Sequence, residues 1–302
     1  MILGIDIGGT TTKLGLVQEG AVIARERIPT VGHADDHAFA DALTVAAQGL
    51  LRTEDLPALL GVGIGAPNAN QLTGIIEMAP NLPWKHDVPF ARMMQDRLGV
   101  PAVLGNDANA AALGEWRYGA GQGYDDLLVA TIGTGVGSGF IVNGQLVLGS
   151  AGNAGELGHM TIVVDGRPCT CGRKGCLEAY VSIRGMRQTY AELATDLSVL
   201  QEEGVRCIAD AAHRGDAAAL RTFEGSVGWL AIGLANAVAV TGPRRVVLFG
   251  GITRSGDLLI TPLRNRFQDA LLNIYKGRVD LTISALPDDD AALLGAAALT
   301  TL

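Results

Sequence analysis

Residues 2–28 read ILGIDIGGTTTKLGLVQEGAVIARERI, and their pattern decides the fold. Two apolar runs flank a turn of glycine and threonine, and a second turn at Glu19–Gly20 leads into a third run. Such runs, separated by glycine-containing turns, predict an antiparallel meander of three strands. Residues 127–150 repeat the plan with the turns TGVGSG and Asn143–Gly144. Self-similarity at a spacing of about 125 residues predicts two related domains with a cleft between them.

The rest of the chain alternates strand-like runs with helical segments rich in alanine and leucine, which is typical of the α/β class. The strand-like runs are LLGVGIGA, PAVLGN, RRVVLFGG and LTISAL. The last segment, DDDAALLGAAALTTL, has an acidic start and then small and apolar residues. This pattern predicts an N-capped helix that packs against a sheet of the first domain. We therefore expect a smaller N-terminal α/β domain of residues 1–115 and 290–302 and a larger one of residues 116–289.

The composition indicates a globular protein with small-molecule partners. The chain has 302 residues, 48% of them apolar, which is enough to bury a sizeable core. Acidic residues number 31 against 23 basic ones, and the net charge of −8 argues against nucleic-acid binding. The N-terminus lacks the features of a signal peptide, and the longest apolar run, residues 229–240, is too short to span a bilayer. We expect a cytoplasmic protein that binds neither nucleic acid nor a membrane.

The glycine turns have the residue types that bind phosphate. Glycines let backbone N–H groups approach an anion closely, and hydroxyls and a lysine can complete the contact. A tight hairpin that only needs positive φ would have a similar sequence. Two such turns in two related domains favour a nucleotide, and a third glycine pair follows the strand RRVVLF, where a loop can meet a purine or ribose. The candidate nucleotide-binding residues are Asp6, Gly8, Gly9, Thr10, Lys13, Gly133, Thr134, Gly135, Gly250 and Gly251.

Three of the four cysteines lie within eight residues, behind a histidine. His159, Cys169, Cys171 and Cys176 have the spacing H-x9-C-x-C-x4-C. Zinc favours four tetrahedral thiolate and imidazole ligands, so the spacing predicts a closed, structural Zn²⁺ site. A disulfide is a poor alternative, because Cys169 and Cys171 are too close in sequence to pair easily. The fourth cysteine, Cys207, is expected to pack in the core.

Asn106 and Asp107 follow an apolar strand and precede an alanine-rich helix. Phosphoryl transfer to an alcohol needs an aligned nucleophile and a group that takes its proton, and a carboxylate suffices. The alternative is that one of the two residues merely caps the helix, as asparagine and aspartate often do. The sequence alone leaves both open.

Taken in order along nearly the whole chain, the motifs resemble those of the ROK family of sugar kinases, within the larger group of actin-like ATPases. They are DIGGTTTK, GIGAPN, NLPW, GNDANAAALGE, IGTGVGSG, GELGH, CTCGRKGCLE and FGG. The resemblance implies two actin-like (ribonuclease H-like) α/β domains with a cleft between them, and commonly a homodimer. It implies transfer of the γ-phosphate of ATP, with Mg²⁺, to the 6-hydroxyl of a hexose. Glucose is the first expected substrate, and fructose, allose, N-acetylglucosamine and N-acetylmannosamine are alternatives.

The resemblance also implies roles for individual residues. Asp107 would take the proton from the sugar's primary hydroxyl, and His159 would bind zinc through one ring nitrogen and a sugar hydroxyl through the other. Asp6 would orient Mg²⁺, although stabilising the hairpin is a rival role. Further hydroxyl-binding residues would be Asn81, Asn106, Glu156 and Glu178. The family often has glycine where this chain has Asn68, so Asn68 is a further candidate for contact with the sugar.

Two other functional classes remain open. A non-catalytic sugar sensor, like the repressors of the family without their DNA-reading module, would not need both glycine turns together with Asp107. An ATP-driven switch on the same fold would keep the phosphate turns but would have no use for hydroxyl-binding carboxylates. Because the chain has both sets of residues, the sequence favours the kinase.

Overall fold

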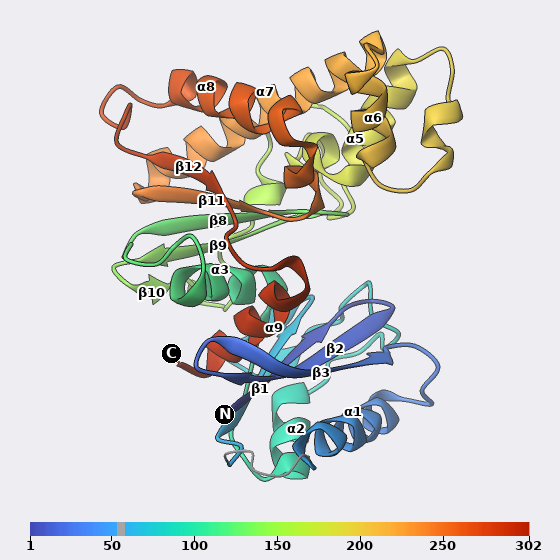
Figure 1. Ribbon diagram of the computed structural model, residues 1–302, viewed down its shortest axis with the longest axis vertical. Helices are drawn as coiled ribbons and strands as arrows, with labels where there is room; N and C mark the ends of the chain where they lie inside the picture. Colours follow the sequence, from blue (N-terminus) through green and yellow to red (C-terminus); the bar gives the residue numbers. More distant parts are fainter. Residues whose placement is uncertain (53–57, 302) are drawn as a thin grey trace. The chain divides into compact units, whose positions relative to one another are not determined.

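The computed structural model describes residues 1–52 and 58–301 and divides into two compact units. Unit 1 consists of Met1–Asp125, Gly139–Ala154 and Ala285–Leu302, and unit 2 of Asp126–Ser138 and Gly155–Ser284. Each unit combines strands with helices, which confirms the predicted α/β class (Figure 1). The predicted domain boundaries stay a prediction.

A five-stranded sheet organises unit 1, with the strand order β3-β2-β1-β4-β7. Strands β1, β2 and β3 form the predicted antiparallel meander, and β1, β4 and β7 run parallel. The bounds are β1 Ile2–Ile7, β2 Thr11–Gln18, β3 Ala21–Pro29, β4 Gly61–Ala66 and β7 Ala102–Asn106. The carboxyl ends of β1, β4 and β7 therefore meet at one edge of the sheet, where Asp6 and Asn106 lie.

Helices cover both faces of this sheet (Figure 1). One face packs on α1, Asp36–Leu51, and α2, Phe90–Leu98, around a core that includes Phe39 and Phe90. The other face packs on α9, Asp288–Ala298, which in turn contacts α3, Asp107–Tyr118. The neighbouring glycines Gly4 and Gly63 allow this approach, because a Cβ on them would come within 2.3 Å and 1.9 Å of carbonyl oxygens of α9. The predicted return of the C-terminal helix to the first sheet is confirmed.

Residues 67–88 form an irregular segment at the edge of unit 1. It contains the short hairpin of β5, Ala69–Asn70, and β6, Ile75–Ile76. Trp84 is buried and packs against Phe39, with ring centroids 4.9 Å apart. The expectation that Trp84 packs in the loop is therefore confirmed.

The second sheet repeats the strand–turn–strand plan, as expected. Its strand order is β10-β9-β8-β11-β12, with β11 parallel to both β8 and β12. The bounds are β8 Leu127–Ile132, β9 Val136–Val142, β10 Gln145–Leu146, β11 Arg245–Phe249 and β12 Asp280–Ile283. The division between the two units falls within β9.

Unit 2 also contains five α-helices in the part of the chain that the structure describes, and α7 is central among them. It packs against α5, α6 and α8. The bounds are α4 Glu178–Val181, α5 Ile183–Leu193, α6 Arg206–His213, α7 Ala217–Thr241 and α8 Ile260–Ala270. Four 3₁₀ segments complete the described chain: η1 Leu157–His159, η2 Ser198–Gln201, η3 Gly251–Leu258 and η4 Leu299–Thr301.

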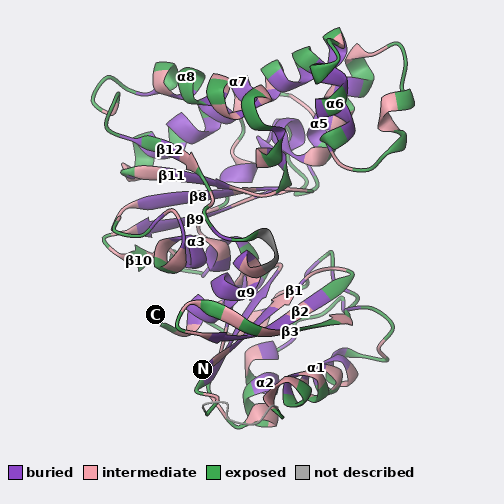
Figure 2. Cartoon of the chain, in the orientation of Figure 1, coloured by how far each residue is buried: buried purple, intermediate pink, exposed green. Residues whose placement is uncertain are grey.

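Helix α7 is longer than the apolar run in the sequence suggested. It has 25 residues, begins after the N-cap Asp216 and ends at Gly242, which adopts the left-handed conformation. Its length and composition would allow it to cross a membrane, but 56% of its most apolar window is buried inside the protein (Figure 2). Helix α7 is therefore a core helix of unit 2.

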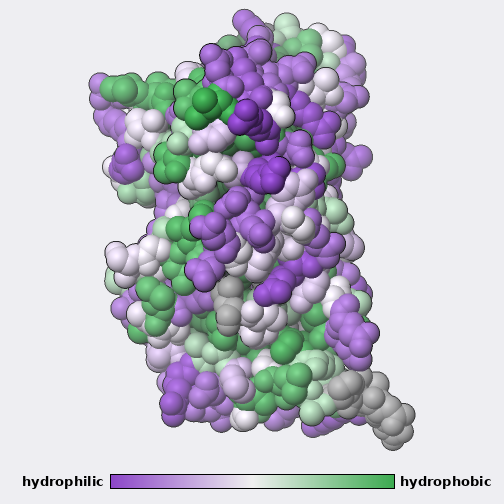
Figure 3. Space-filling view, turned by 90° about the vertical axis from the view of Figure 1, so that its left-hand side faces the viewer, coloured by the Kyte–Doolittle hydropathy of each residue, from purple (hydrophilic) through white to green (hydrophobic). Residues whose placement is uncertain are grey.

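Hydrophilic and hydrophobic residues are interspersed over the face of the molecule that Figure 3 shows.

Candidate active site

The first glycine turn, between β1 and β2, is tight because of close contacts and not because of unusual dihedral angles. Neither Gly8 nor Gly9 has positive φ, so the hairpin alternative in its simple form is not supported. A Cβ on Gly8 would lie 2.8 Å from the carbonyl oxygen of Thr11, and one on Gly9 would lie 2.8 Å from that of Asn81. Only glycine therefore fits at these two positions, where the turn lies against its own backbone and against the loop that carries Asn81.

Two buried threonines that sequence reasoning missed hold this turn. The hydroxyl of Thr30 donates to the carbonyl oxygen of Gly8 at 2.7 Å, and it also lies 2.8 Å from the hydroxyl of Thr12. Both threonine side chains are fully buried. Their contacts join residues 18 and 22 positions apart in the sequence, so nothing in the local sequence pattern could reveal them.

Asp6 and Lys13 lie directly opposite each other on β1 and β2, and Asp107 is close enough to affect Asp6 electrostatically. Desolvation by burial and, second, the charge of Asp107 raise the pKa of Asp6 to about 6, while Lys13 opposes the shift. The structure therefore brings two predicted carboxylates and one predicted lysine together. Such an arrangement favours a cation beside the two acidic groups.

Asn106 and Asp107 lie at the junction of β7 and α3. The side chain of Asn106 caps α3 by accepting a hydrogen bond from the Ala108 N–H at 2.9 Å, so the capping alternative is confirmed for Asn106. Asp107 Oδ1 accepts from the same N–H at 2.8 Å, which leaves its other oxygen for another partner. Its side chain is accessible, yet desolvation by the surrounding protein raises the pKa of Asp107, and the Ala108 N–H opposes this shift.

Asn68 and Asn81 lie in the irregular segment 67–88, and both are exposed. Asn68 has a φ of 50°, a left-handed conformation that asparagine tolerates better than most residues. Its amide donates to the carbonyl oxygen of Glu77 at 3.2 Å. Asparagine can thus adopt the backbone turn for which the family resemblance led us to expect glycine.

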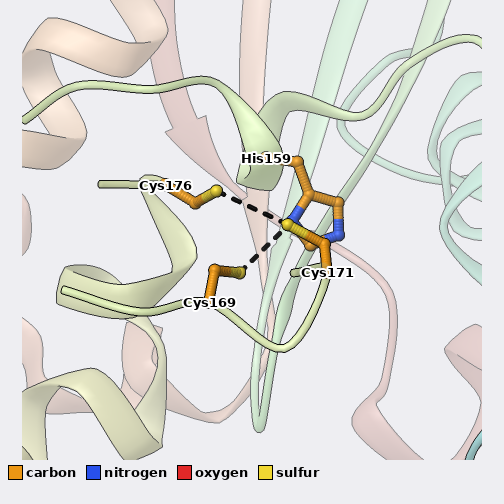
Figure 4. Close-up of side chains that lie close together, drawn as sticks. All are labelled: His159, Cys169, Cys171 and Cys176. Atoms are coloured by element: carbon orange, nitrogen blue, oxygen red, sulfur yellow. Dashed lines mark hydrogen bonds between the residues drawn. The ribbon is translucent and has the colours of Figure 1, made fainter. Parts of the chain in front are cut away.

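In unit 2, the predicted metal ligands converge (Figure 4). One ligand atom from each of His159, Cys169, Cys171 and Cys176 lies within 4.8 Å of the others, and all four cysteines of the chain are free thiols. His159 Nδ1 lies 3.6 Å from Cys169 Sγ, and Cys171 Sγ lies 3.6 Å from Cys176 Sγ. Because Zn–S bonds are about 2.3 Å long, ligand atoms on a tetrahedral Zn²⁺ lie at nearly this spacing, so the cluster fits zinc.

The electrostatics of the cluster differ between its thiols. Burial and the neighbouring thiols raise the pKa of Cys176 to about 12. For Cys171, desolvation is outweighed by hydrogen bonds from the Arg173 backbone and the other thiols, which lower its pKa. Cys207 lies apart and is buried, as expected for core packing.

The two nitrogens of His159 have different surroundings. Nδ1 faces the sulfur atoms, whereas Nε2 lies 3.8 Å from the carboxylate of Glu156. Glu156 precedes the 3₁₀ turn η1 that ends with His159 and is more than half exposed. The ring can therefore hold a metal with one nitrogen and present the other, beside a carboxylate, to a polar ligand.

Glu178 occupies a different environment from the one expected of a free sugar ligand. It is buried, and its Oε2 accepts a hydrogen bond from the Val136 N–H at 3.0 Å, within the second glycine turn. Its Oε1 accepts from the Thr170 hydroxyl at 3.2 Å and lies 3.4 Å from Arg184. The structure thus places Glu178 between the cysteine loop and the second glycine turn.

The second and third glycine motifs border unit 2's sheet. The N–H of Gly133 donates to the carbonyl oxygen of Gly135 at 2.9 Å, and Thr134 between them is exposed. Gly250 has a φ of 114°, and a Cβ there would lie 2.3 Å from the carbonyl oxygen of Ile132, so only glycine fits.

A cavity of about 480 Å³ lies next to the third glycine motif. Gly251 and Arg254 line it from η3, Ile183 lines it from α5, and Arg206, Asp210 and His213 line it from α6. Its volume suits a small organic ligand, and its charged and polar side chains can form hydrogen bonds with such a ligand. The residues from α6 were missed by sequence reasoning, because no motif marks them.

Comparison with known proteins explains why glycine turns, two close carboxylates and a His/Cys cluster occur in one chain. The family model described as ROK family matches residues 2–301. The chain belongs to the ROK family. A glucokinase from Thermotoga maritima is 34% identical, over 99% of this chain and 96% of that protein. A putative xylose repressor from Caldicellulosiruptor is 30% identical over 99% of this chain and 77% of its own length.

Solved structures of the ROK family have the same fold. A ROK family glucokinase from Streptomyces griseus, solved in complex with glucose and AMPPNP, is 33% identical with a TM-score of 0.82. The alignment covers 99% of this chain and 98% of that one. The chain therefore has the two-domain actin-like fold of the ROK sugar kinases, as the sequence motifs predicted.

Proposed function

We propose that this ROK protein is an ATP-dependent hexokinase that phosphorylates glucose at its 6-hydroxyl to give glucose 6-phosphate. The observation that carries the proposal is its full-length similarity to glucokinases, one of them solved with glucose and an ATP analogue. The chain also contains residues of the types that each half of the proposed reaction needs: glycine turns for phosphate, and polar side chains for sugar hydroxyls.

In the proposed reaction, O6 of the hexose attacks the γ-phosphorus of ATP and ADP leaves. Asp107 accepts the proton of the 6-hydroxyl through Oδ2, the oxygen that does not accept the Ala108 N–H. The raised pKa of Asp107 makes it a better proton acceptor than an ordinary aspartate, provided that it is ionised. Asn106 contributes chiefly by holding the first turn of α3 and with it Asp107, and its remaining hydrogen-bonding capacity serves a neighbouring hydroxyl.

The remaining hydroxyls of the sugar are assigned to two groups of residues. Asn68 and Asn81 come from the irregular segment of unit 1, where both are exposed. Glu156 precedes the turn η1, His159 ends it, and Glu178 begins α4. The exposed carboxylate of Glu156 and the Nε2 atom of His159 are the accessible members of the second group.

The nucleotide is assigned to the glycine motifs and to the cavity of unit 2. The backbone N–H groups around Gly8, Gly9 and Gly133–Gly135, with Thr10 and Lys13, would contact the phosphates. The base and ribose would occupy the cavity beside Gly250 and Gly251. Mg²⁺ bound near Asp6 would compensate the negative charges of Asp6 and Asp107; burial and, second, the charge of Asp107 raise the pKa of Asp6.

The cluster of His159 with Cys169, Cys171 and Cys176 would hold a structural Zn²⁺ ion. Four protein ligands leave no open position, so the ion's contribution is to fix the loop and the orientation of the His159 ring. We further propose a homodimer, as the family resemblance implies, and a cytoplasmic location, as expected from the sequence.

A second candidate is a sugar sensor without kinase activity, since a xylose repressor of the same family matches 99% of this chain. One assay separates the two: ADP release coupled to a visible readout, over glucose, mannose, fructose, allose, N-acetylglucosamine, N-acetylmannosamine and xylose. We expect the highest kcat/KM with glucose and no ADP release without sugar. Sugar binding by calorimetry with no ADP release for any sugar would favour the sensor.

A further inference from the structure

The short segment that follows the cysteine loop holds the second glycine turn at both ends. The N–H of Ile183 donates to the carbonyl oxygen of Gly133 at 2.8 Å. The N–H of Val136 donates to the Glu178 carboxylate at 3.0 Å. Residues 178–183 therefore fix where the turn begins and where it ends.

The other oxygen of the same carboxylate contacts the cysteine loop. Glu178 Oε1 accepts a hydrogen bond from the hydroxyl of Thr170, at 3.2 Å, and lies 3.8 Å from Cys169 Sγ. Thr170 stands between two of the proposed metal ligands, Cys169 and Cys171. One buried carboxylate thus connects the loop that would hold the metal with the turn that would hold phosphate.

The second glycine turn packs so closely against Glu178 that the turn and this side chain should move together. A Cβ on Gly135 would lie 2.6 Å from Glu178 Oε2, and a Cβ on Gly158 would lie 2.1 Å from the carbonyl oxygen of Val136. A charged acceptor also binds a backbone N–H more strongly than a neutral one does, especially in a buried position. Any shift of the carboxylate should therefore change the order of the turn.

We propose that Glu178 is a positioning residue through which the metal-holding loop orders the turn Gly133–Val136, so that loss of the metal weakens nucleotide binding. The proposal deepens the function proposed above and rests on it for the identity of the nucleotide. The same contacts place Ile183, which lines the 480 Å³ cavity, on the segment that responds to the loop. Metal binding and nucleotide binding would thus be coupled within unit 2.

The variant Thr170→Val tests the connection without touching a metal ligand. It removes the hydroxyl at nearly constant shape, and Thr170 is exposed, so the fold should tolerate it. With zinc content unchanged, we expect affinity for the fluorescent nucleotide mant-ADP, measured with Mg²⁺ and without sugar, to fall about fivefold, the effect of one hydrogen bond. The amide of Val136 should exchange with deuterium faster. Thr241→Val, which loses only a bond to the Ala237 carbonyl on α7, is the matched control and should change neither quantity.

Removal of the metal completes the test. Cys171→Ser, or chelation of the wild-type protein, should weaken mant-ADP binding at least as much, and Thr170→Val should then have no additional effect. Unchanged nucleotide affinity and unchanged exchange at Val136 in Thr170→Val would overturn the proposal, and so would additive effects of the two changes. If the wild-type protein binds no nucleotide, the proposed function fails, while exchange at Val136 still tests whether the loop orders the turn.

Discussion

The carboxylate of Asp6, near the end of β1, feels the negative charge of Asp107, at the start of α3, in the folded protein. Desolvation by burial and then the negative charge of Asp107 raise the pKa of Asp6 to about 6, and Lys13 only partly compensates. Two like charges at a sheet edge cost stability unless a cation joins them. The pair therefore indicates a place where stability has been given up for function.

Asp6→Asn should make the protein more stable at neutral pH. The pKa of Asp6 is 3.8 in a model peptide and about 6 in the folded protein, so the folded state holds an extra proton between these values. The free energy of unfolding must then fall as the pH rises through this window. Without Mg²⁺, we expect Asp6→Asn to gain roughly 1 to 3 kcal/mol at pH 7 and almost nothing near pH 4. Urea denaturation at both pH values checks this, with Asp87→Asn at an exposed site as the control.

Asp107→Asn should remove most of the activity and little of the sugar affinity. The amide oxygen can still accept the Ala108 N–H, so the start of α3 stays intact, but the side chain can no longer take a proton. We expect kcat to fall by roughly 10²- to 10⁴-fold, with glucose affinity by calorimetry within a factor of a few. In the wild type, kcat/KM should fall as the pH drops through the raised pKa of Asp107. A near-normal kcat in the variant would remove Asp107 from the role of base.

The sequence was sufficient to predict the parts of the fold that depend on local pattern. The apolar runs between glycine turns indicated both meanders, and the spacing of the cysteines indicated the cluster with His159. The apolar run at residues 229–240 covers only the second half of α7, because the first half, from Ala217, mixes polar with apolar residues, while burial against its neighbours makes it helical. Tertiary packing decides such a boundary more than composition does.

Contacts between distant segments could not be predicted from one sequence. Asn70 was in no motif that indicated a role, yet its side chain bonds Ala151, 81 residues further along. Glu178 was expected beside a sugar, and its bond to Val136 was not foreseen. The α6 side of the cavity was likewise missed, because one sequence does not show that Arg206 and Asp210 lie beside the third glycine motif.

The purified protein should contain one zinc ion per chain, held by the cysteine loop. Cys176→Ser replaces a buried ligand and should abolish zinc binding and lower the melting temperature, since structural zinc contributes directly to folding. Cys207→Ser changes the one cysteine outside the cluster and should keep full zinc content. Elemental analysis with thermal melting checks both. Zinc retained in Cys176→Ser, or absent from wild-type protein purified with zinc, would contradict the assignment.

Asn70→Asp should destabilise unit 1 strongly, although the two side chains have nearly the same size. Both amide hydrogens of the buried Asn70 are used, one on the Glu77 carboxylate at 2.7 Å and one on the Ala151 carbonyl at 2.8 Å. A carboxylate there would face two acceptors, so we expect a loss of roughly 3 kcal/mol by urea denaturation. Adding Glu77→Gln supplies a donor and should recover part of the loss. Asn236→Asp, at an exposed position of α7, is the control, and an equally small effect at both sites would contradict the prediction.

Ala209→Leu should selectively weaken nucleotide binding. Ala209 is buried on α6 and lines the 480 Å³ cavity, so the larger side chain takes up space that the base of ATP would occupy, while leucine remains a good helix former. We expect the KM for ATP to rise about tenfold or more, the effect of roughly 1.4 kcal/mol of lost binding, with the KM for glucose nearly unchanged. Ala191→Leu, at an exposed position of α5, controls for the added volume. An unchanged KM for ATP in a folded variant would place the nucleotide elsewhere, because a base in this cavity could not avoid the new side chain.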